Sequence, residues 1–401
     1  MGMILRIVSS RIMGEGGVVG RSWHFCLNLY DNSVMRGRVH ARRTLKGLVA
    51  DLRSMCSFRL FGLQKPKEKE VWSTEVTEED LKNAVEDEYG VKYSKDWKRL
   101  LKAPRNLDGV YSIRIGVKVI ANKAFCFCES LVNINIPKGI TSIGNGAFSD
   151  CKSLTNINIP NTVKSIGDDA FSECESLTNI NISKSLTTIK DWTFLRCYSL
   201  GNINIPDRLT SIGNRAFYDC KSLTNIKIPN TVASIGYSAF SYCKSLTSIN
   251  IPDSVTSIGD SAFESCESLT NINIPDSITS IEDYVFSGCV SLKSINIPDS
   301  VTSIGDSAFS ECVSLKSINI PDSVTSIGDS AFSGCESLTS INIPDGVTSI
   351  GDWAFSSCYS LTSINIPDSV TSIGNYAFSD CKSLTSINIP KWCENYRNWY
   401  F

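Results

Sequence analysis

The chain has 401 residues and a formal net charge of −2, so it is long enough to bury a large core. Its charge is unevenly spread: residues 1–106 carry 20 Lys and Arg against 13 Asp and Glu, whereas residues 107–390 carry 17 against 27. The acidic balance of residues 107–390 disfavours binding to nucleic acid, whose phosphates attract basic surfaces. No stretch approaches the roughly 20 apolar residues that cross a bilayer, so we expect no membrane span.

Residues 1–64 form a basic segment with little hydrophobic patterning, which we expect to be flexible. Within it, apolar residues recur at helical spacing and predict a helix over Arg42–Met55. At the start, Arg6 interrupts a short apolar stretch that lacks a clear small-residue cleavage site. The sequence therefore does not support a standard signal peptide.

Residues 65–106 are interpreted as a linker followed by a short helical lead-in cap. The segment Lys65–Glu70 is charged and contains a proline, as semi-rigid linkers often do. Thr77 followed by Asp80 predicts the start of a short helix with a capping box.

A 23-residue period dominates residues 107–390 and gives twelve full copies. Counted from its cysteine, one unit reads C-x-x-L-x-x-I-x-I-P-x-x-V-x-x-I-G-x-x-A-F-x-x, and its Phe, its Leu and the two Ile that follow Leu are present in every copy. The cysteines of the repeat are Cys128, Cys151, Cys174, Cys197, Cys220, Cys243, Cys266, Cys289, Cys312, Cys335, Cys358 and Cys381. Their strict spacing marks a repeat position and not a framework of disulfide pairs.

Each part of the unit predicts a local structure. Leu-x-x-Ile-x-Ile is a short strand whose two Ile point to one side, and proline ends it because proline donates no hydrogen bond. Val-x-x-Ile-Gly is a second extended piece, in which glycine permits the backbone angle of a corner. The Asp or Asn that follows glycine in eleven of twelve copies suits the N-cap of a short helical turn, which would place Ala, Phe and Cys inward.

One unit cannot bury its own apolar side chains, but stacked units can. We therefore expect a repeat solenoid, a β-rich superhelix of twelve full coils with short parallel strands, short helical turns and degenerate capping coils. Successive coils rise by roughly 4.8 Å, so the rod is about 55–60 Å long. Residues 391–401 place Cys393, Tyr396 and Phe401 in framework columns, which predicts an aromatic partial coil over the open end.

The segment Ile251–Phe263, IPDSVTSIGDSAF, resembles the repeats of the BspA-like leucine-rich-repeat family. The resemblance extends over about residues 107–390, and Tyr93–Leu101 also resembles the lead-in of members from gut and oral bacteria. It implies a leucine-rich-repeat solenoid in a surface or secreted protein, one that adheres to host proteins, other microbes or extracellular matrix.

The column of repeat cysteines could form disulfides, bind zinc or pack in the core. Stacked cysteines would lie roughly 5 Å apart, within disulfide range, but their side chains run parallel and do not converge. Single cysteines in a ladder also lack the closed tetrahedral grouping of a zinc site. We expect them to pack in the core as small apolar residues, with no metal and no cofactor.

Catalytic groupings are missing from the repeats. The only histidines, His24 and His40, precede them, so the repeats hold no Ser–His or Cys–His pair. The Asp that follows proline in many copies, as in Asp253 and Asp299, recurs because a turn favours it, and a repeated residue is not a special one. We therefore expect no enzyme.

Two sets of residues are candidates for partner binding. Asn stands between the two strand Ile in eleven of twelve copies, and this column could be a structural ladder of amide hydrogen bonds, a polar strip that binds a partner, or both. Aromatic residues interrupt the consensus in the turn and could form two exposed patches, Trp192 with Tyr198 and Trp353 with Tyr359 and Tyr376. The candidate residues are Trp192, Tyr198, Tyr284, Trp353, Tyr359, Tyr376, Asn296, Asn319, Asn342 and Asn365.

The favoured hypothesis is a monomeric protein- or glycan-binding module, which the resemblance places at the cell surface or among secreted proteins. A second hypothesis is a cytoplasmic scaffold or regulatory adaptor with the same solenoid, which reduced cysteines and the missing export signal favour. An enzyme within residues 1–106 is a third, disfavoured because that segment is small and shows no catalytic grouping.

Overall fold

The computed structural model describes residues 7–9, 23–25 and 72–390. Contacts divide the chain into two units, Met1–Glu70 and Val71–Phe401. In the first unit, β1 (Ile7–Ser9) pairs antiparallel with β2 (Trp23–Phe25). Most of the basic segment, the helix predicted over 42–55 and the partial coil predicted over 391–401 lie outside the described residues.

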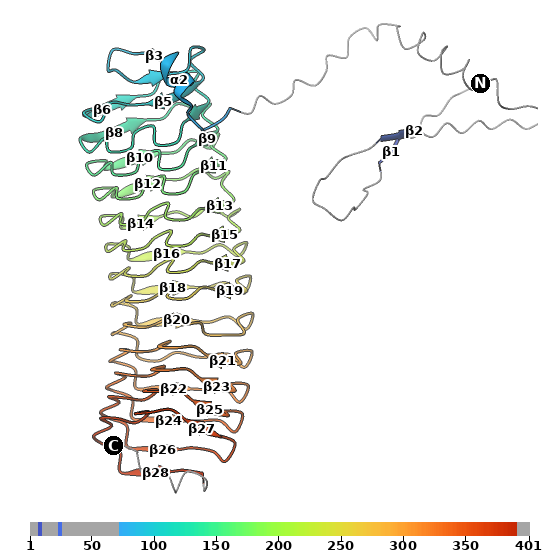
Figure 1. The fold of residues 1–401 in the computed structure, drawn as a ribbon, viewed down its shortest axis with the longest axis vertical. Coiled ribbons are helices and arrows are strands. Elements are labelled where there is room, and N and C mark those ends of the chain that lie inside the picture. The colour runs from blue at the N-terminus through green and yellow to red at the C-terminus, as the bar shows by residue number, and fades with distance from the viewer. Residues whose placement is uncertain (1–6, 10–22, 26–71, 391–401) are drawn as a thin grey trace, which may run out of the picture. The chain divides into compact units, whose positions relative to one another are not determined.

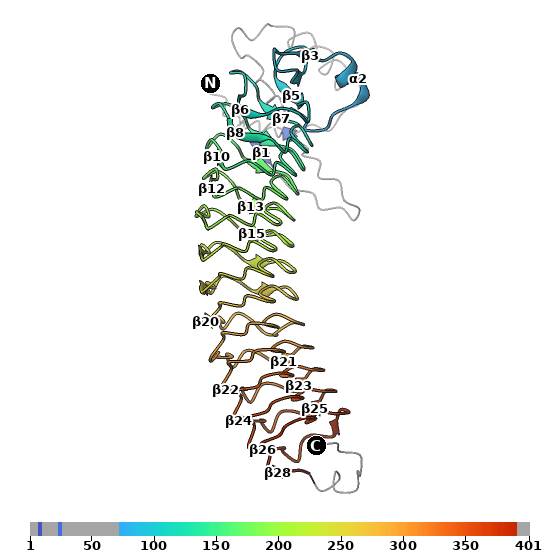
Figure 2. The same ribbon diagram turned by 90° about the vertical axis from the view of Figure 1, so that its left-hand side faces the viewer.

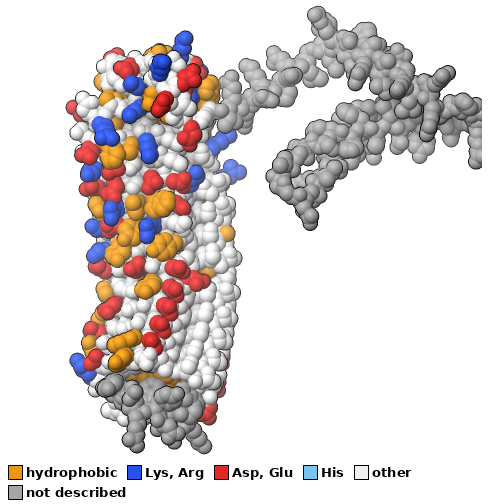
Figure 3. All heavy atoms as spheres, viewed as in Figure 1, with side chains coloured by type: hydrophobic (Ala, Val, Ile, Leu, Met, Phe, Trp, Pro, Cys, Tyr) orange, Lys and Arg blue, Asp and Glu red, His pale blue; other side chains and the backbone are white. Residues whose placement is uncertain are grey.

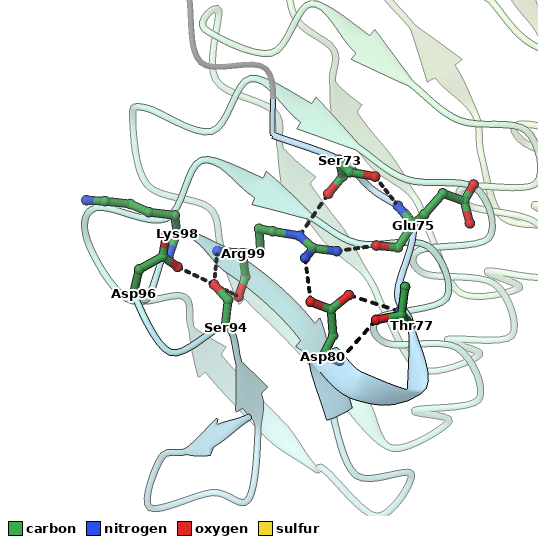
Figure 4. Close-up of polar contacts among 8 residues, drawn as sticks. All are labelled: Ser73, Glu75, Thr77, Asp80, Ser94, Asp96, Lys98 and Arg99. Carbon is green, nitrogen blue, oxygen red and sulfur yellow. Dashed lines mark hydrogen bonds and ion pairs between the residues drawn. The ribbon is translucent and has the colours of Figure 1, made fainter. Parts of the chain in front are cut away.

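The second unit begins with a capped helical turn, α2 (Glu78–Lys82). The Thr77 hydroxyl accepts the Asp80 amide at 3.1 Å, and the Asp80 carboxylate accepts the Thr77 amide at 2.9 Å, so the predicted capping box is confirmed. Arg99 donates to Asp80 at 2.8 Å and to the Ser73 carbonyl at 2.9 Å (Figure 4). The bond from the Thr77 amide is the main cause that lowers the pKa of Asp80.

Antiparallel strands then join the lead-in to the solenoid. The strands β3 (Val85–Glu86), β4 (Lys92–Tyr93) and β5 (Arg99–Lys102) pair in sequence, and β5 pairs parallel with β7 (Val119–Ile120) of the first coils. Behind them, the buried hydroxyls of Tyr93 and Tyr111 are hydrogen-bonded. The lead-in therefore covers the N-terminal end of the stacked core.

The strands before the proline stack into one face of the rod, each parallel to the strand one coil away (Figures 1 and 2). An eight-stranded sheet and a four-stranded sheet make up this face, and single bridges at Asn296 link them. Its strands are β6 (Gly109–Ser112), β8 (Leu131–Asn135), β10 (Asn156–Asn158), β12 (Asn179–Asn181), β14 (Asn202–Ile203), β16 (Asn225–Lys227), β18 (Ser248–Asn250), β20 (Asn271–Asn273), β22 (Ser317–Asn319), β24 (Ser340–Asn342), β26 (Ser363–Asn365) and β28 (Ser386–Asn388).

Two-residue strands after the proline form a second face, with residues 23 apart in register. This face is divided into three sheets. Besides β7 its strands are β9 (Ser142–Ile143), β11 (Ser165–Ile166), β13 (Thr188–Ile189), β15 (Ser211–Ile212), β17 (Ser234–Ile235), β19 (Ser257–Ile258), β21 (Ser303–Ile304), β23 (Ser326–Ile327), β25 (Ser349–Ile350) and β27 (Ser372–Ile373). The predicted repeat solenoid of short parallel strands is confirmed.

The core is a set of continuous columns. Phe rings from Phe125 to Phe378 stack face to face, with centroids 5.1–5.8 Å apart and planes within 18°. Each repeat cysteine donates its thiol to a backbone carbonyl of the preceding coil, as Cys266 does to Phe240 at 3.3 Å. The thiol thus does more than the expected apolar packing, because it donates a second hydrogen bond to a carbonyl that also accepts the Cys243 amide.

The turn between glycine and cysteine is not helical, contrary to our prediction. Two residues per turn have left-handed backbone, such as Ser261 (φ 54°) and Ser265 (φ 53°), and a helix cannot pass through them. Alternate amides donate to the next coil, Ser261 to Asp283 at 2.8 Å and Phe263 to Val285 at 3.0 Å. The turn therefore directs its backbone hydrogen bonds to stacking and not to a helix of its own.

The Asp or Asn after glycine, which we call the acceptor column, has a different role from the predicted N-cap. Its side chain accepts the amide of the same position in the next coil, as Asp306 does from Asp329 at 2.8 Å. Four such bonds of 2.6–2.8 Å run without a break from Asp283 to Asn375. The residue caps the neighbouring coil and not its own turn.

The glycine itself makes this close approach possible. A Cβ atom added to Gly328 would lie 2.6 Å from the Asp306 carboxylate oxygen and 2.7 Å from its amide nitrogen, and the backbone of Gly328 is not left-handed. Glycine is therefore needed here for space and not, as predicted, for its backbone angle. We call this position the glycine column.

Ala121, Lys190 and Glu282 replace glycine in that column. The sheet is continuous at Ala121, where the preceding coil is the lead-in, but the other two replacements coincide with a break. The second face is interrupted between β11 and β13, and between β19 and the isolated bridge at Ile281. The acceptor bond is missing across the same two boundaries, where the amides of Asp191 and Asp283 have no partner within residues 72–390. The Phe stack continues across both, with centroids 5.6 and 5.8 Å apart.

Candidate partner-binding surface

Aromatic side chains stand in the first left-handed position of the turn, directly after the acceptor column. Trp192, Tyr284, Trp353 and Tyr376 have φ of 53–61° and exposed fractions of 37–46%. Other coils place small or charged residues here, including Ser307. The turn column, as we call it, is thus a position where the backbone holds a side chain out from the core.

The predicted C-terminal patch is formed in part. The rings of Trp353 and Tyr376 stack with centroids 4.4 Å apart and planes 20° apart, and their exposed fractions are 43% and 45%. Tyr359 does not touch this pair and instead lies under the ammonium of Lys382 at 4.5 Å. The Trp353–Tyr376 pair is therefore an exposed aromatic surface whose two rings are held together by stacking.

The predicted pair of Trp192 and Tyr198 is not brought together. Tyr198 lies under the Lys221 ammonium at 4.1 Å, and burial is the main cause that raises its pKa. Trp192 has no ring contact within residues 72–390. The two residues are therefore separate features of the middle coils.

Sequence analysis missed a second aromatic group in these coils. The guanidinium of Arg215 lies 5.7 Å from the Tyr218 ring and 5.1 Å from the Tyr237 ring, and Tyr218 contacts Tyr242 at 5.4 Å. Tyr237 takes the place of Asp or Asn in the acceptor column, and that departure was the available signal. Figure 3 shows hydrophobic and basic side chains mixed over this part of the face, above a line of acidic side chains.

The asparagine column is exposed, but it is not a continuous amide ladder. Within residues 72–390, one pair of its members is bonded, Asn388 to Asn365 at 2.7 Å. The amides of Asn296, Asn319 and Asn342 have no side-chain partner there, while their backbones are bridged to neighbouring coils. Their polar groups are therefore free to meet a partner.

The repeat cysteines are not reactive groups. Burial raises the pKa of the Cys289 and Cys335 thiols to about 12, so both are protonated at neutral pH. The described cysteines are all free. The described residues also contain no cluster of three or more His, Cys, Asp or Glu suited to a metal ion. Among them, no helix is long and apolar enough to cross a membrane.

Family comparison agrees with the repeat geometry. Residues 118–247, 210–336 and 302–401 each match the model of the BspA type leucine-rich repeat region. The chain belongs to this BspA-type leucine-rich-repeat family. The resemblance that we drew from IPDSVTSIGDSAF is confirmed. A comparison with curated proteins finds no match.

Solved structures of bacterial leucine-rich-repeat proteins are similar to this BspA-type chain. A leucine-rich cell surface protein from Faecalibacterium prausnitzii has 32% identity and a TM-score of 0.56, covering 76% of this chain and 94% of that one. A leucine-rich-repeat protein from Bacteroides ovatus has 30% identity over 78% of this chain and 94% of that one, with a TM-score of 0.45. The family and the first of these structures support a repeat binding module.

Proposed function

We propose that the chain is an adhesion module that binds a protein or glycan through aromatic side chains of its turn column. The observation that carries the proposal is the exposed Trp353–Tyr376 stack. Tyr and Trp offer large, rigid contact areas at low cost in side-chain entropy, and they are enriched among residues that dominate binding energy.

Conformational cost supports the proposal. A left-handed backbone costs a non-glycine residue about 1–2 kcal/mol, and Gly146 shows that glycine fits the same position. Trp353 and Tyr376 leave 43% and 45% of their surfaces exposed, so packing within the chain uses only part of these large rings. Large aromatic residues held outward in such a position are better explained by a partner than by stability.

Location at the cell surface is part of the same proposal. It rests on the family and on the similarity to a protein described as a leucine-rich cell surface protein. The free thiols do not distinguish this location from the cytoplasm, because burial and hydrogen bonds to carbonyls protect them in either compartment. Fractionation of the source cells separates the two, since a wholly cytosolic protein would reject adhesion.

Binding by the full chain tests the proposed surface. The double variant Trp353→Ser/Tyr376→Ser uses a residue that other coils carry in the turn column, so we expect it to fold. Against immobilised matrix proteins and glycans, its affinity for any bound ligand should fall by at least about tenfold. The matched control is Val290→Glu, which removes another exposed apolar side chain and introduces the residue that Glu336 provides one position after its own cysteine. Equal affinity of wild type and double variant would reject the aromatic surface.

A further inference from the structure

A groove follows the corner where the chain leaves the first face. One part of it has a volume of about 970 Å³ and is lined by Asn158, Ile159, Pro160, Ile205 and other residues of the first four coils. A smaller part of about 360 Å³ continues at Ile251 and Pro252. The groove has an apolar floor, and the asparagine column is one of its walls.

The opposite wall contains the residue that follows the proline position, which we call the corner column. Its charge changes along the rod. In the first coils it carries Lys138 and Lys184, and Arg208 stands beside its member Asp207; all of these line the groove. From the sixth to the eleventh coil the column carries only aspartate, at Asp253, Asp276, Asp299, Asp322, Asp345 and Asp368, and in the twelfth coil the sequence has Lys391.

These six corner aspartates lie in hydrogen-bonded turns, as the sequence predicts, but their side chains do not stabilise those turns. All six are exposed, and within residues 72–390 their carboxylates accept no hydrogen bond and form no ion pair. The side chains of Lys138, Lys184 and Arg208 are also exposed and form no ion pair there. Carboxylates stacked roughly 4.8 Å apart repel one another, so the fold gains nothing from this arrangement.

We propose that the corner is the interface of an antiparallel pair formed with a second copy of this chain. A two-fold axis makes an interface self-complementary, and the corner meets that condition because one end is basic and the other is acidic. With the axis between the coils of Asn230 and Asp253, Lys184 faces Asp299 and Lys138 faces Asp345 of the second copy.

One pair of like charges remains in this register. Asp207 of one copy faces Asp276 of the other, and the guanidinium of Arg208, next to Asp207 in the chain, supplies the opposite charge at that level. The remaining corner aspartates face lysine or asparagine, or lie beyond the basic coils. The register therefore places three basic residues of each copy, Lys138, Lys184 and Arg208, opposite aspartates of the other copy.

The length of the corner agrees with such a contact. Ten coils span about 45 Å, and a stable dimer buries about 800 Å² on each partner. A strip about 15–20 Å wide supplies that area, and it includes the corner, the groove and the asparagine column. This interface is separate from the turn column, so the pairing does not depend on the proposed adhesion.

The mass of the full chain in solution tests the pairing. Sedimentation and light scattering should show a dimer at low ionic strength that weakens as salt rises, because salt screens exposed charges. The variants are an acid-reversed chain, Asp299→Lys/Asp345→Lys, and a base-reversed chain, Lys138→Asp/Lys184→Asp. Each substitution uses a residue that the corner column already carries elsewhere, so both chains should fold. Glu336→Lys, an exposed reversal outside the corner, is the control.

If the dimer depends on opposite charges across the interface, the reversed chains should fail to pair alone but should pair with each other. Each reversed chain alone should be monomeric, with a dissociation constant raised at least about tenfold. An equimolar mixture of the two should recover the dimer, and Glu336→Lys should behave as wild type. A wild-type chain that stays monomeric, or a dimer that both reversals leave intact, would overturn the proposal. Binding of polyglutamate to a monomeric chain would also overturn it and would assign the groove to another acidic partner.

Discussion

Two parts of the second face differ in one column of the repeat. From Gly305 to Gly374 the glycine column is unbroken, the strands β21 to β27 form one sheet, and the acceptor bonds are continuous. At Lys190 and Glu282 the sheet and the acceptor bonds both stop. The comparison teaches that the fit of neighbouring full repeats on this face depends on the absence of a long side chain at this position, whereas the Phe stack tolerates its presence.

Replacing a glycine of the intact part of the glycine column should have the largest effect on stability. Gly328→Glu places a side chain against Asp306, because a Cβ atom at this position would lie within 2.7 Å of two Asp306 atoms. We expect a loss of about 1–3 kcal/mol in the free energy of unfolding, as in other overpacked sites. Urea denaturation measures it, with Val290→Glu as the control for an added exposed carboxylate. A loss no larger than that of the control would contradict the role of the glycine column.

Restoring glycine at one of the two natural breaks should instead raise the free energy of unfolding. Glu282→Gly lets the coil approach its neighbour, so the amide of Asp283 can donate to the Asp260 carboxylate as in the intact coils. The new hydrogen bonds contribute about 0.5–1.5 kcal/mol each, and glycine costs about 0.5–1 kcal/mol in chain entropy. We expect a net gain of about 1 kcal/mol. Glu336→Gly, which carries the entropy cost alone, should instead destabilise the chain.

The two aspartate columns should respond differently to truncation. Asp306→Ala leaves the Asp329 amide without its acceptor and should cost about 1 kcal/mol, whereas Asp306→Asn keeps an acceptor and should be near neutral. Asp299→Ala, in the corner column, should stay within about 0.5 kcal/mol of wild type. Unfolding curves that show equal losses of free energy for Asp306→Ala and Asp299→Ala would contradict the different roles of the acceptor and corner columns.

The smallest effect concerns pH at the Glu282 junction. Burial, with the charges of Asp283 and Glu282, raises the pKa of Asp260. A carboxyl with a raised folded-state pKa destabilises the fold as pH rises above its unfolded value of about 3.9. Glu282→Gly removes one charge and supplies a donor, so its stabilising effect should be a few tenths of a kcal/mol larger at about pH 7 than at about pH 3.5. A constant difference between the two unfolding curves would contradict this cause.

Much of the fold was predictable because the repeat displays the same environment twelve times. The period, the strand positions, the inward Phe and Cys and the capping box at Thr77 follow from residue type and spacing. The conformation of the turn was not predictable, because its left-handed residues include Ser261 and Ser265, and serine has no preference for a left-handed backbone. Trp97, also left-handed at φ 58°, has none either.

The candidate surface was predictable only where consensus breaks mark it. Trp353 and Tyr376 departed from the small or charged residues of their column, and the structure stacks them. Tyr237 departed as well, but its link to Arg215 depends on which neighbours the stacking supplies. The break at Glu282 could not be predicted from the sequence. It depends on the short distance between the glycine column and the acceptor residue of the preceding coil, which the sequence of one unit does not show.

Residue-resolved amide hydrogen exchange of the wild-type chain tests the junctions most directly. The amides of Asp306 and Asp329 donate to carboxylates of the preceding coil, and they should exchange slowly. The amides of Asp191 and Asp283, which follow Lys190 and Glu282, should exchange faster by at least about tenfold. Equal protection at all four positions would show that the coils are joined alike throughout, and would contradict the account.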